Sequence, residues 1–232
     1  MIFNFKHFSI EQSNAVLKVG TDAFVLGAFF EASSPKNILD IGAGTGVLSL
    51  IAAQKFQNAN IDAIEIDAES ARLAAKNFGN SPWTDRLYIH HSSLQDFTTS
   101  KTYDLIVSNP PFFENSSAAD TEVKNRVKHN GGLSASELIE KVDRFLSEEG
   151  ECWLILSVDF MRNYLKEIER FKLNIVQEIS VFGKPEFLKR KILVLSKKPS
   201  HKQKIDFTIR NKEGKYSDEY IALTKELHDR AL

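Results

Sequence analysis

Residues 40–46 read Asp-Ile-Gly-Ala-Gly-Thr-Gly and connect two segments of different periodicity. The preceding segment, Lys36–Ile41, is a short apolar run typical of a buried strand, whereas Thr45–Phe56 carries apolar residues at helical spacing. Glycine lacks a Cβ atom, so it lets the backbone turn sharply and approach a ligand closely. Three glycines provide this freedom here, Gly42, Gly44 and Gly46. The loop therefore predicts an α/β fold with a ligand site after its first core strand.

Strand and helix signals alternate along the rest of the chain. Further strands are predicted at 60–66, 87–90, 103–108, 152–157, 175–182 and 189–195, the last two as an antiparallel pair. Helices are predicted to start at Asp67, at Ser134, whose capping box is completed by Glu137, and at Asp159. This order predicts a doubly wound α/β fold with a seven-stranded, mostly parallel sheet that contains one antiparallel strand.

The two ends of the chain are interpreted as parts of one domain, residues 1–232. Residues 1–33 form an extension with a helix from about Asp22, and we expect this extension to cover the ligand site on its substrate side. Residues 34–232 form the α/β core. Within them, residues 205–232 suggest one more strand and a C-terminal helix from Ser217.

Charge is distributed unevenly along the chain. The formal net charge is −1, but Lys184–Lys215 holds nine Lys and two Arg against three acidic residues, a net charge of +8. The remainder therefore carries −9. A basic segment on an acidic body favours a surface that faces a polyanion. A solvated strand pair whose lysines protect an exposed sheet edge explains the charge equally well.

The remaining composition excludes several classes of protein. The single cysteine, Cys152, rules out a disulfide framework within the chain, and its apolar surroundings favour a small buried hydrophobic residue. The histidines lack metal-ligand spacing, so we expect no metal. Neither a signal peptide nor an apolar run long enough for a membrane span is present in the sequence. We therefore expect a cytoplasmic protein without membrane contact.

An acidic residue, Glu65, ends the second predicted core strand, 21 residues after Gly44. A carboxylate at this place can accept hydrogen bonds from both hydroxyls of a ribose. Position 47 is Val where the dinucleotide fingerprint requires Gly or Ala, so the pattern indicates an adenosyl group without a pyrophosphate. Leu94 and Asp96 follow the third strand, where an adenine ring would rest. The alternative is a tight turn beside an exposed acid.

The fourth predicted core strand ends in Asn109-Pro-Pro-Phe112, a rigid loop at the functional edge of the sheet. An exocyclic amine on a nucleobase is a poor nucleophile, because its lone pair is delocalised into the ring. The Asn109 side-chain oxygen and the Pro110 carbonyl can accept the amine hydrogens and free the lone pair. Pro110 and Pro111 restrain the acceptors, and Phe112 can stack on the target ring. A plain turn is the competing interpretation.

Together, the glycine loop and Asn109–Phe112 resemble the amino-group methyltransferases of the Rossmann-like superfamily. Four further segments resemble a narrower family, the bacterial methyltransferases that modify N6 of adenine 37 in a valine tRNA. They are Phe5–Phe8, Leu17–Ala23, Asn80–Trp83 and Tyr216–Tyr220. This resemblance covers nearly the whole chain. It implies a Rossmann-like fold, S-adenosylmethionine as cofactor and tRNA as substrate.

Residue roles also follow from the resemblance. It implies a cofactor site made of Lys18, Thr21, Asp40, Gly42, Gly44, Gly46, Glu65, Ser93, Leu94 and Asn109, and catalytic roles for Asn109, Pro110, Pro111 and Phe112. Two positions depart from the family pattern. Phe112 stands where relatives often carry Tyr, so stacking is kept but a hydroxyl contact is lost. Ser93 stands where many relatives place an acid for the cofactor adenine, so the roles of Ser93 and Asp96 stay open.

Residues on the substrate side are less sharply defined. Residues 113–132, which include Phe113 and Arg126, are interpreted as a lid that orders on RNA, or equally as a simple loop. We expect Lys189, Arg190 and Lys191 to contact phosphates, and the protein to act as a monomer. A protein glutamine amide or another nucleobase amine presents a similar planar NH₂ group and remains an alternative substrate. A binding module without activity would not need an intact Asn109–Phe112 motif, and a small-molecule methyltransferase would not need the basic segment.

Overall fold

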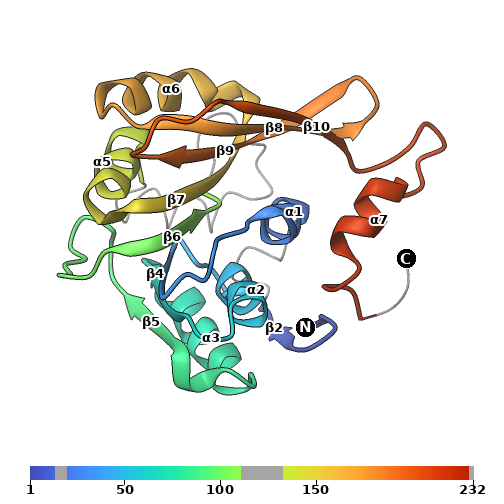
Figure 1. The fold of residues 1–232 in the computed structure, drawn as a ribbon. Helices are drawn as coiled ribbons and strands as arrows, with labels where there is room; N and C mark the ends of the chain where they lie inside the picture. The colour runs from blue at the N-terminus through green and yellow to red at the C-terminus, as the bar shows by residue number, and fades with distance from the viewer. Residues whose placement is uncertain (14–19, 111–132, 230–232) are drawn as a thin grey trace.

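The centre of the structure is an eight-stranded sheet with the order β10-β8-β9-β7-β6-β3-β4-β5 (Figure 1). The structure is a computed structural model and describes residues 1–13, 20–110 and 133–229. Within this sheet, as the structure describes it, only the pairs made by β9 are antiparallel, so β9 runs opposite to the other seven strands. The strands are β3 (Asn37–Ile41), β4 (Asn60–Glu65), β5 (Leu87–His91), β6 (Tyr103–Ser108), β7 (Leu146–Ser157), β8 (Asn174–Lys184), β9 (Phe187–Ser196) and β10 (Gln203–Thr208).

The doubly wound fold with one antiparallel strand is confirmed, but the prediction of seven strands is wrong by one. The additional strand is β10, which pairs in parallel with β8 at the sheet edge. A strand near Ile205 was expected from the sequence, but its partner in the sheet, Ile179, lies 26 positions earlier in the chain. Pairing between distant segments depends on the tertiary fold and leaves no local pattern.

Helices cover both faces of the sheet. One face carries α1 (Thr21–Phe29), α2 (Val47–Lys55), α3 (Ala68–Gly79) and α7 (Asp218–Thr224), whereas α5 (Ala135–Phe145) and α6 (Met161–Arg170) cover the other. Successive strand residues contribute to opposite cores, as Ile38 and Leu39 show. Both faces are therefore buried, which explains the nearly continuous apolar runs of the central strands.

The expected helix starts are confirmed at two capping residues. The Asp67 carboxylate accepts a hydrogen bond from the Ser70 backbone N–H at 2.9 Å, which satisfies a free donor of the first turn of α3. At α5, Ser134 and Glu137 form the complete capping box that their spacing predicts. These local contacts fix where both helices leave the sheet.

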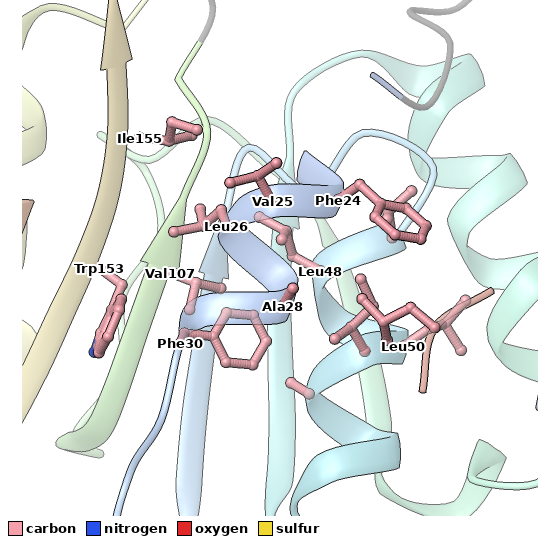
Figure 2. Close-up of a cluster of buried hydrophobic side chains, with 14 of the residues drawn as sticks. Phe24, Val25, Leu26, Ala28, Phe30, Leu48, Leu50, Val107, Trp153 and Ile155 are labelled. Carbon is pink, nitrogen blue, oxygen red and sulfur yellow. The ribbon is translucent and has the colours of Figure 1, made fainter. Parts of the chain in front are cut away.

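Helix α1 belongs to the N-terminal extension and is buried in the core (Figure 2). Val25 and Leu26 are fully buried, and the close-up shows them facing Val107 and Ile155 of the sheet. A Cβ atom on Gly27 would lie 2.5 Å from Ile51 Cδ1, so this glycine lets α1 and α2 approach each other closely. The extension is thus held by the same hydrophobic packing that holds the core.

The two ends of the chain meet beside α1. A small antiparallel hairpin of β1 (Ile2–Asn4) and β2 (Ser9–Glu11) is followed along the chain by α1, and Phe5 forms a β-bridge with His228. Phe5 also stacks on Phe8 and on Phe24, with ring centroids 4.4 and 5.4 Å apart. This aromatic contact fastens the N-terminal hairpin to α1 and to the C-terminal segment.

Candidate active site

The glycine loop adopts a backbone that only glycine adopts without strain. Its three glycines, Gly42, Gly44 and Gly46, have φ angles of 74°, 57° and 87°. A Cβ atom at Gly46 would lie 2.4 Å from Phe78 Cε1, so that glycine is needed for packing against α3. Among residues 1–13, 20–110 and 133–229, no atom lies within 4 Å of where a Cβ atom at Gly42 or Gly44 would be. The loop therefore has a packed side and an open side.

Glu65 holds the loop in this shape. Its Oε2 accepts a hydrogen bond from the Gly44 N–H and its Oε1 one from the Asp67 N–H, each at 2.8 Å. Burial raises the pKa of the Glu65 carboxyl, although hydrogen bonds from backbone N–H groups, chiefly those of Asp67 and Gly44, oppose the shift. A carboxylate offers about four lone-pair positions, so two acceptor positions remain beyond these bonds.

Asp40 lies beneath the loop and is fully buried. Its Oδ2 accepts hydrogen bonds from the Ser49 hydroxyl at 2.6 Å and from the Ser49 N–H at 3.0 Å. Its Oδ1 is buried and has no hydrogen-bond partner among the described residues. Burial raises the pKa of Asp40 to about 7, even though Ser49 stabilises the charged form. A buried acceptor without a partner is costly, and it fits a ligand that brings a donor.

The sheet brings the second motif next to this loop. In the parallel pair β3–β6, Ile41 is in register with Ser108, and the Ser108 hydroxyl donates to the Ile41 carbonyl at 2.7 Å. Gly42 and Asn109 directly follow these two residues, so the glycine loop and the Asn109 loop leave the same edge side by side. Because β4 flanks β3 on its other side, Glu65 ends at this edge too. The strand order thus assembles three segments that are distant in sequence.

The side chain of Asn109 is half-buried and Pro110 is buried. Pro111, Phe112, Phe113, Arg126 and Lys18 lie outside the described residues. Ser108 was not singled out in the sequence, although a hydroxyl directly before Asn109 at a strand end was an available signal. Ser49 was missed as well, and its signal was a polar residue within an otherwise apolar helical stretch.

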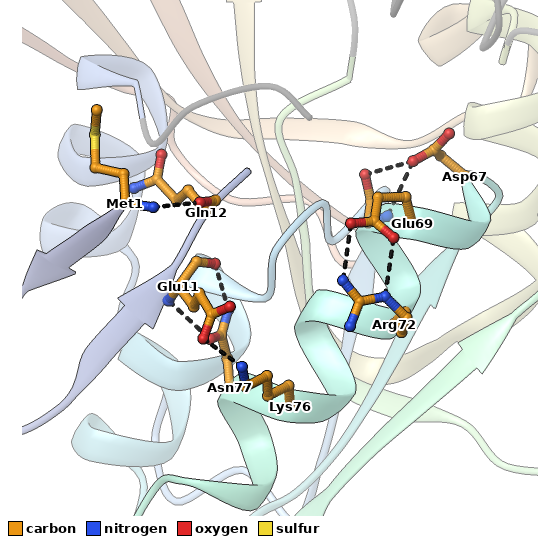
Figure 3. Close-up of polar contacts among 9 residues, drawn as sticks. Met1, Glu11, Gln12, Asp67, Glu69, Arg72, Lys76 and Asn77 are labelled. Atoms are coloured by element: carbon orange, nitrogen blue, oxygen red, sulfur yellow. Dashed lines mark hydrogen bonds and ion pairs between the residues drawn. The ribbon is translucent and has the colours of Figure 1, made fainter. Parts of the chain in front are cut away.

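A third residue missed by sequence reasoning is Asn77 of α3, which is 1% exposed (Figure 3). Its amide nitrogen donates to the Thr45 carbonyl at 2.9 Å and to the Glu11 carbonyl at 3.2 Å. Its amide oxygen accepts from the Glu11 N–H at 2.8 Å. Asn77 therefore connects the glycine loop with the N-terminal hairpin. An asparagine within a helix carries no local sign of such contacts.

The segment after β5 lies beside Glu65, because the Ser92 N–H donates to the Glu65 carbonyl at 3.0 Å. Leu94 is buried in the core on the α5 side of the sheet. The Ser93 hydroxyl donates to Asp96 Oδ2 at 2.6 Å and accepts from the Asp96 N–H at 3.1 Å. These mutual bonds fix the turn, and the exposed Asp96 retains acceptor capacity.

A cavity of about 500 Å³ lies between β5 and the following segment, with Asp96 and Thr99 in its wall. Asp62, which also lines it, accepts hydrogen bonds from Lys101 at 2.7 Å and from His90 at 2.8 Å. Burial by itself would raise the pKa of the Asp62 carboxyl. The hydrogen bonds and charges of Lys101 and His90 outweigh burial, so the pKa of Asp62 is lowered. The cluster is explained as a buried carboxylate with its compensating partners.

The basic residues predicted from the sequence are placed unequally. Lys189 is exposed, whereas Arg190 forms an ion pair with Asp22 and Lys191 one with Glu178.

Thr21 is the first residue of α1 and is exposed. Cys152 is fully buried and burial raises the pKa of its thiol, which confirms a packing role.

The described part of the chain contains neither a cluster of metal-binding side chains nor a helix that could span a membrane. In residues 1–13, 20–110 and 133–229, no three His, Cys, Asp or Glu side chains come together as metal ligands do. Over those same ranges no helix has the length and apolar character needed to cross a membrane.

Three loops, carrying three glycines, Glu65 and Asn109-Pro110, meet at one edge of a doubly wound sheet, which is the architecture of a Rossmann-like methyltransferase. The chain belongs to the methyltransferase small domain family, whose model matches residues 11–175.

Curated relatives match over nearly their whole length. The chain is 38% identical to the tRNA1(Val) (adenine(37)-N6)-methyltransferase of Flavobacterium psychrophilum over 97% of each chain. It is 37% identical to the protein of that name from Trichodesmium erythraeum, also over 97% of each.

Solved structures at low identity share the fold. A predicted O-methyltransferase from Agrobacterium tumefaciens superimposes with a TM-score of 0.68 at 13% identity, covering 89% of this chain and 96% of that one. A putative RNA methyltransferase from Pyrococcus horikoshii gives 0.52 at 17% identity, covering 75% and 80%.

Proposed function

We propose that this protein transfers a methyl group from S-adenosylmethionine to N6 of adenine 37 in tRNA1(Val). The observation that carries the proposal is the near full-length match to curated enzymes of that activity. The site supports it, because an Asn-Pro loop suited to an amine leaves the sheet beside a glycine loop suited to an adenosyl group.

The residues at the glycine loop fit S-adenosylmethionine. The open side of Gly42 and Gly44 leaves room for a ligand against the backbone. Glu65 retains acceptor positions for the ribose hydroxyls. Asp40 Oδ1, which has no hydrogen-bond partner in the part of the chain that the structure describes, suits the cofactor's amino group. When bound, the cofactor supplies an electrophilic methyl group on a sulfonium. We assign Lys18, Thr21, Ser93 and Leu94 to the same site by family resemblance.

The amine is activated by acceptors and not by a strong base. Asn109 Oδ1 and the Pro110 carbonyl accept the two N6 hydrogens, which orients the nitrogen lone pair towards the methyl group. Pro110 and Pro111 restrain the backbone, so little reorganisation is needed at the moment of transfer. Phe112 stacks on the adenine, and the methylated nitrogen releases its proton to water.

The tRNA approaches from the edge of the sheet at which the loops end. Lys189, Arg190 and Lys191 lie on β9 and would contact phosphates, together with Phe113 and Arg126. Such contacts give affinity that depends strongly on salt and little on sequence. The proposal places the protein in the cytoplasm with its substrate, as a monomer that binds one tRNA.

The decisive experiment is incubation of the protein with labelled S-adenosylmethionine and total tRNA from a strain lacking its gene. Nucleoside mass spectrometry should find N6-methyladenosine in one valine tRNA, at position 37. Asn109→Ala protein is the matched control and should leave the tRNA unlabelled. Label in protein instead of RNA would contradict the proposal and favour a glutamine amide as acceptor.

A further inference from the structure

The β8–β9 hairpin extends beyond the rest of the sheet. Arg190 makes the last pair of β9 with β7, and Phe182 the last pair of β8 with β10. Residues 183–189, here called the hairpin tip, therefore form a two-stranded projection. Figure 1 shows this tip in orange at the upper right, away from the neighbouring ribbons.

The hairpin tip projects at the same edge as the active site. Ser108, the last residue before Asn109, is in register with Leu154 of β7, which pairs with Leu193 of β9. Phe187 lies six residues before Leu193 in β9. Because β9 is antiparallel to β7, Phe187 lies in the direction in which β6 and β7 end. At about 3.3 Å per residue, the tip reaches roughly 20 Å past the level at which the Asn109 loop begins.

The tip presents an aromatic ring to solvent. Phe187 is 65% exposed, although burying such a side chain typically stabilises a protein by about 1.5–3 kcal/mol. A Cβ atom on Gly183 would lie 3.7 Å from Phe187 Cδ1 and 3.8 Å from Lys189 Cδ. The Phe187 ring and the aliphatic part of the Lys189 side chain thus both lie next to Gly183, which has no side chain. The aromatic ring is therefore close to the lysine side chain.

Two lysines of the tip suit a nucleotide, although Glu186 beside the ring is exposed and negatively charged. Lys184, which pairs with Phe187 across the turn, is exposed, and so is Lys189. Within residues 1–13, 20–110 and 133–229, neither lysine forms an ion pair, whereas Arg190 and Lys191 do. An aromatic face flanked by free ammonium groups matches the pattern with which proteins bind unpaired nucleotides.

We infer that the hairpin tip is a second RNA contact, in which Phe187 stacks on an unpaired base of the tRNA other than the methylated adenine. Lys184 and Lys189 bind the adjacent phosphates. This inference rests on the proposed function. It assigns to the tip the role of holding the substrate while the Asn109 loop acts on its target.

Stacking and charge contacts respond differently to salt, and this difference provides the test. The dissociation constant of unmodified tRNA is measured by filter binding over a series of salt concentrations, with wild-type, Phe187→Ala, Phe187→Trp and Lys189→Ala proteins. Phe187→Ala should weaken binding about 10-fold or more at every salt concentration with an unchanged slope, because no counterion is involved. Phe187→Trp should restore the affinity. Lys189→Ala should reduce the slope.

A matched control is Leu165→Ala on α6, since Leu165 is also an exposed apolar side chain at 41% and lies away from the tip. It should bind tRNA like the wild type. The inference is wrong if Phe187→Ala binds tRNA as tightly as the wild type, or if Phe187→Trp binds it as weakly as Phe187→Ala. In either case methylation of tRNA by the wild-type protein would still support the proposed function. A wild-type protein that neither binds nor methylates tRNA would instead refute the proposed function.

Discussion

Arg190 Nε lies 2.8 Å from Asp22 Oδ2, and this ion pair joins β9 to the first turn of α1. Both side chains are about one-fifth exposed, so the pair is only partly screened by water. It connects two segments separated by 168 positions at the edge where the Asn109 loop begins. The carboxylate also sits at the N-terminus of α1, where negative charge is favourable.

The first prediction separates a structural from an RNA-binding role of Arg190. If Arg190 acts through the ion pair, Asp22→Asn and Arg190→Gln should lower the free energy of unfolding by similar amounts, about 1 kcal/mol, with little additivity in the double variant. If it also contacts phosphate, only Arg190→Gln should raise the KM for tRNA. Denaturant titration and steady-state kinetics measure these effects. Equal KM values for both single variants would refute a phosphate contact.

Neutralising the neighbouring lysines provides the second prediction. A Lys189→Gln, Arg190→Gln, Lys191→Gln triple variant should raise the KM for tRNA and flatten its dependence on salt, because fewer counterions are released on binding. The KM for S-adenosylmethionine should stay within about two-fold of the wild-type value. If the KM for tRNA and its salt dependence are both unchanged, RNA binds elsewhere.

Asn109→Ala should reduce turnover by a factor of about 100 or more, by analogy with the loss of one preorganised hydrogen-bond donor from an active site. Cofactor affinity, measured by calorimetry, should stay within a few-fold of the wild-type value.

Glu65→Ala is the complementary variant. It removes the acceptor that holds Gly44, so it should weaken cofactor binding strongly. Normal turnover by Asn109→Ala, or normal affinity of Glu65→Ala, would disprove the respective role.

The raised pKa of Asp40 predicts how stability depends on pH. The pKa is about 7 in the folded protein against 3.8 for an unperturbed carboxyl, so the folded state binds the proton more tightly. Stability from this group is therefore highest at low pH and is lost as pH rises towards 7. Between pH 5.5 and 8.5 the loss should be about 2 kcal/mol for the cofactor-free protein. Asp40→Asn should remove this part of the pH dependence in chemical denaturation, and an identical profile would contradict the assignment.

The contacts of Asn77 predict coupling between the N-terminal hairpin and the cofactor site. Asn77→Asp keeps the acceptor for the Glu11 N–H but loses the donor to the Thr45 and Glu11 carbonyls, so it should raise the KM for S-adenosylmethionine with little change in kcat. Lys76→Ala is the matched control, because it removes only the exposed ion pair between Lys76 and Glu11. Equal KM values for the two variants would show that Asn77 only stabilises the fold.

The local parts of this architecture could be predicted from the sequence. The strand–glycine loop–helix unit around Gly44, the cap at Asp67 and the capping box at Ser134 depend on residues a few positions apart, so their signals are visible in the chain itself. The end of β6 directly before Asn109 could be predicted for the same reason, because prolines cannot continue a central strand. The alternation of strands and helices also sufficed to predict that these loops share one edge of a parallel sheet.

Contacts between distant segments could not be predicted, because they depend on which side chains the fold brings together. The pairing of β10 with β8 added an eighth strand. The bond of Asn77 to Thr45 spans 32 positions and that of Arg190 to Asp22 spans 168, and no short-range pattern encodes either one. The sequence by itself therefore determined where the loops lie and which residue types they carry. Only the tertiary structure decided which residues hold them in place, because buried polar groups find partners through space and not along the chain.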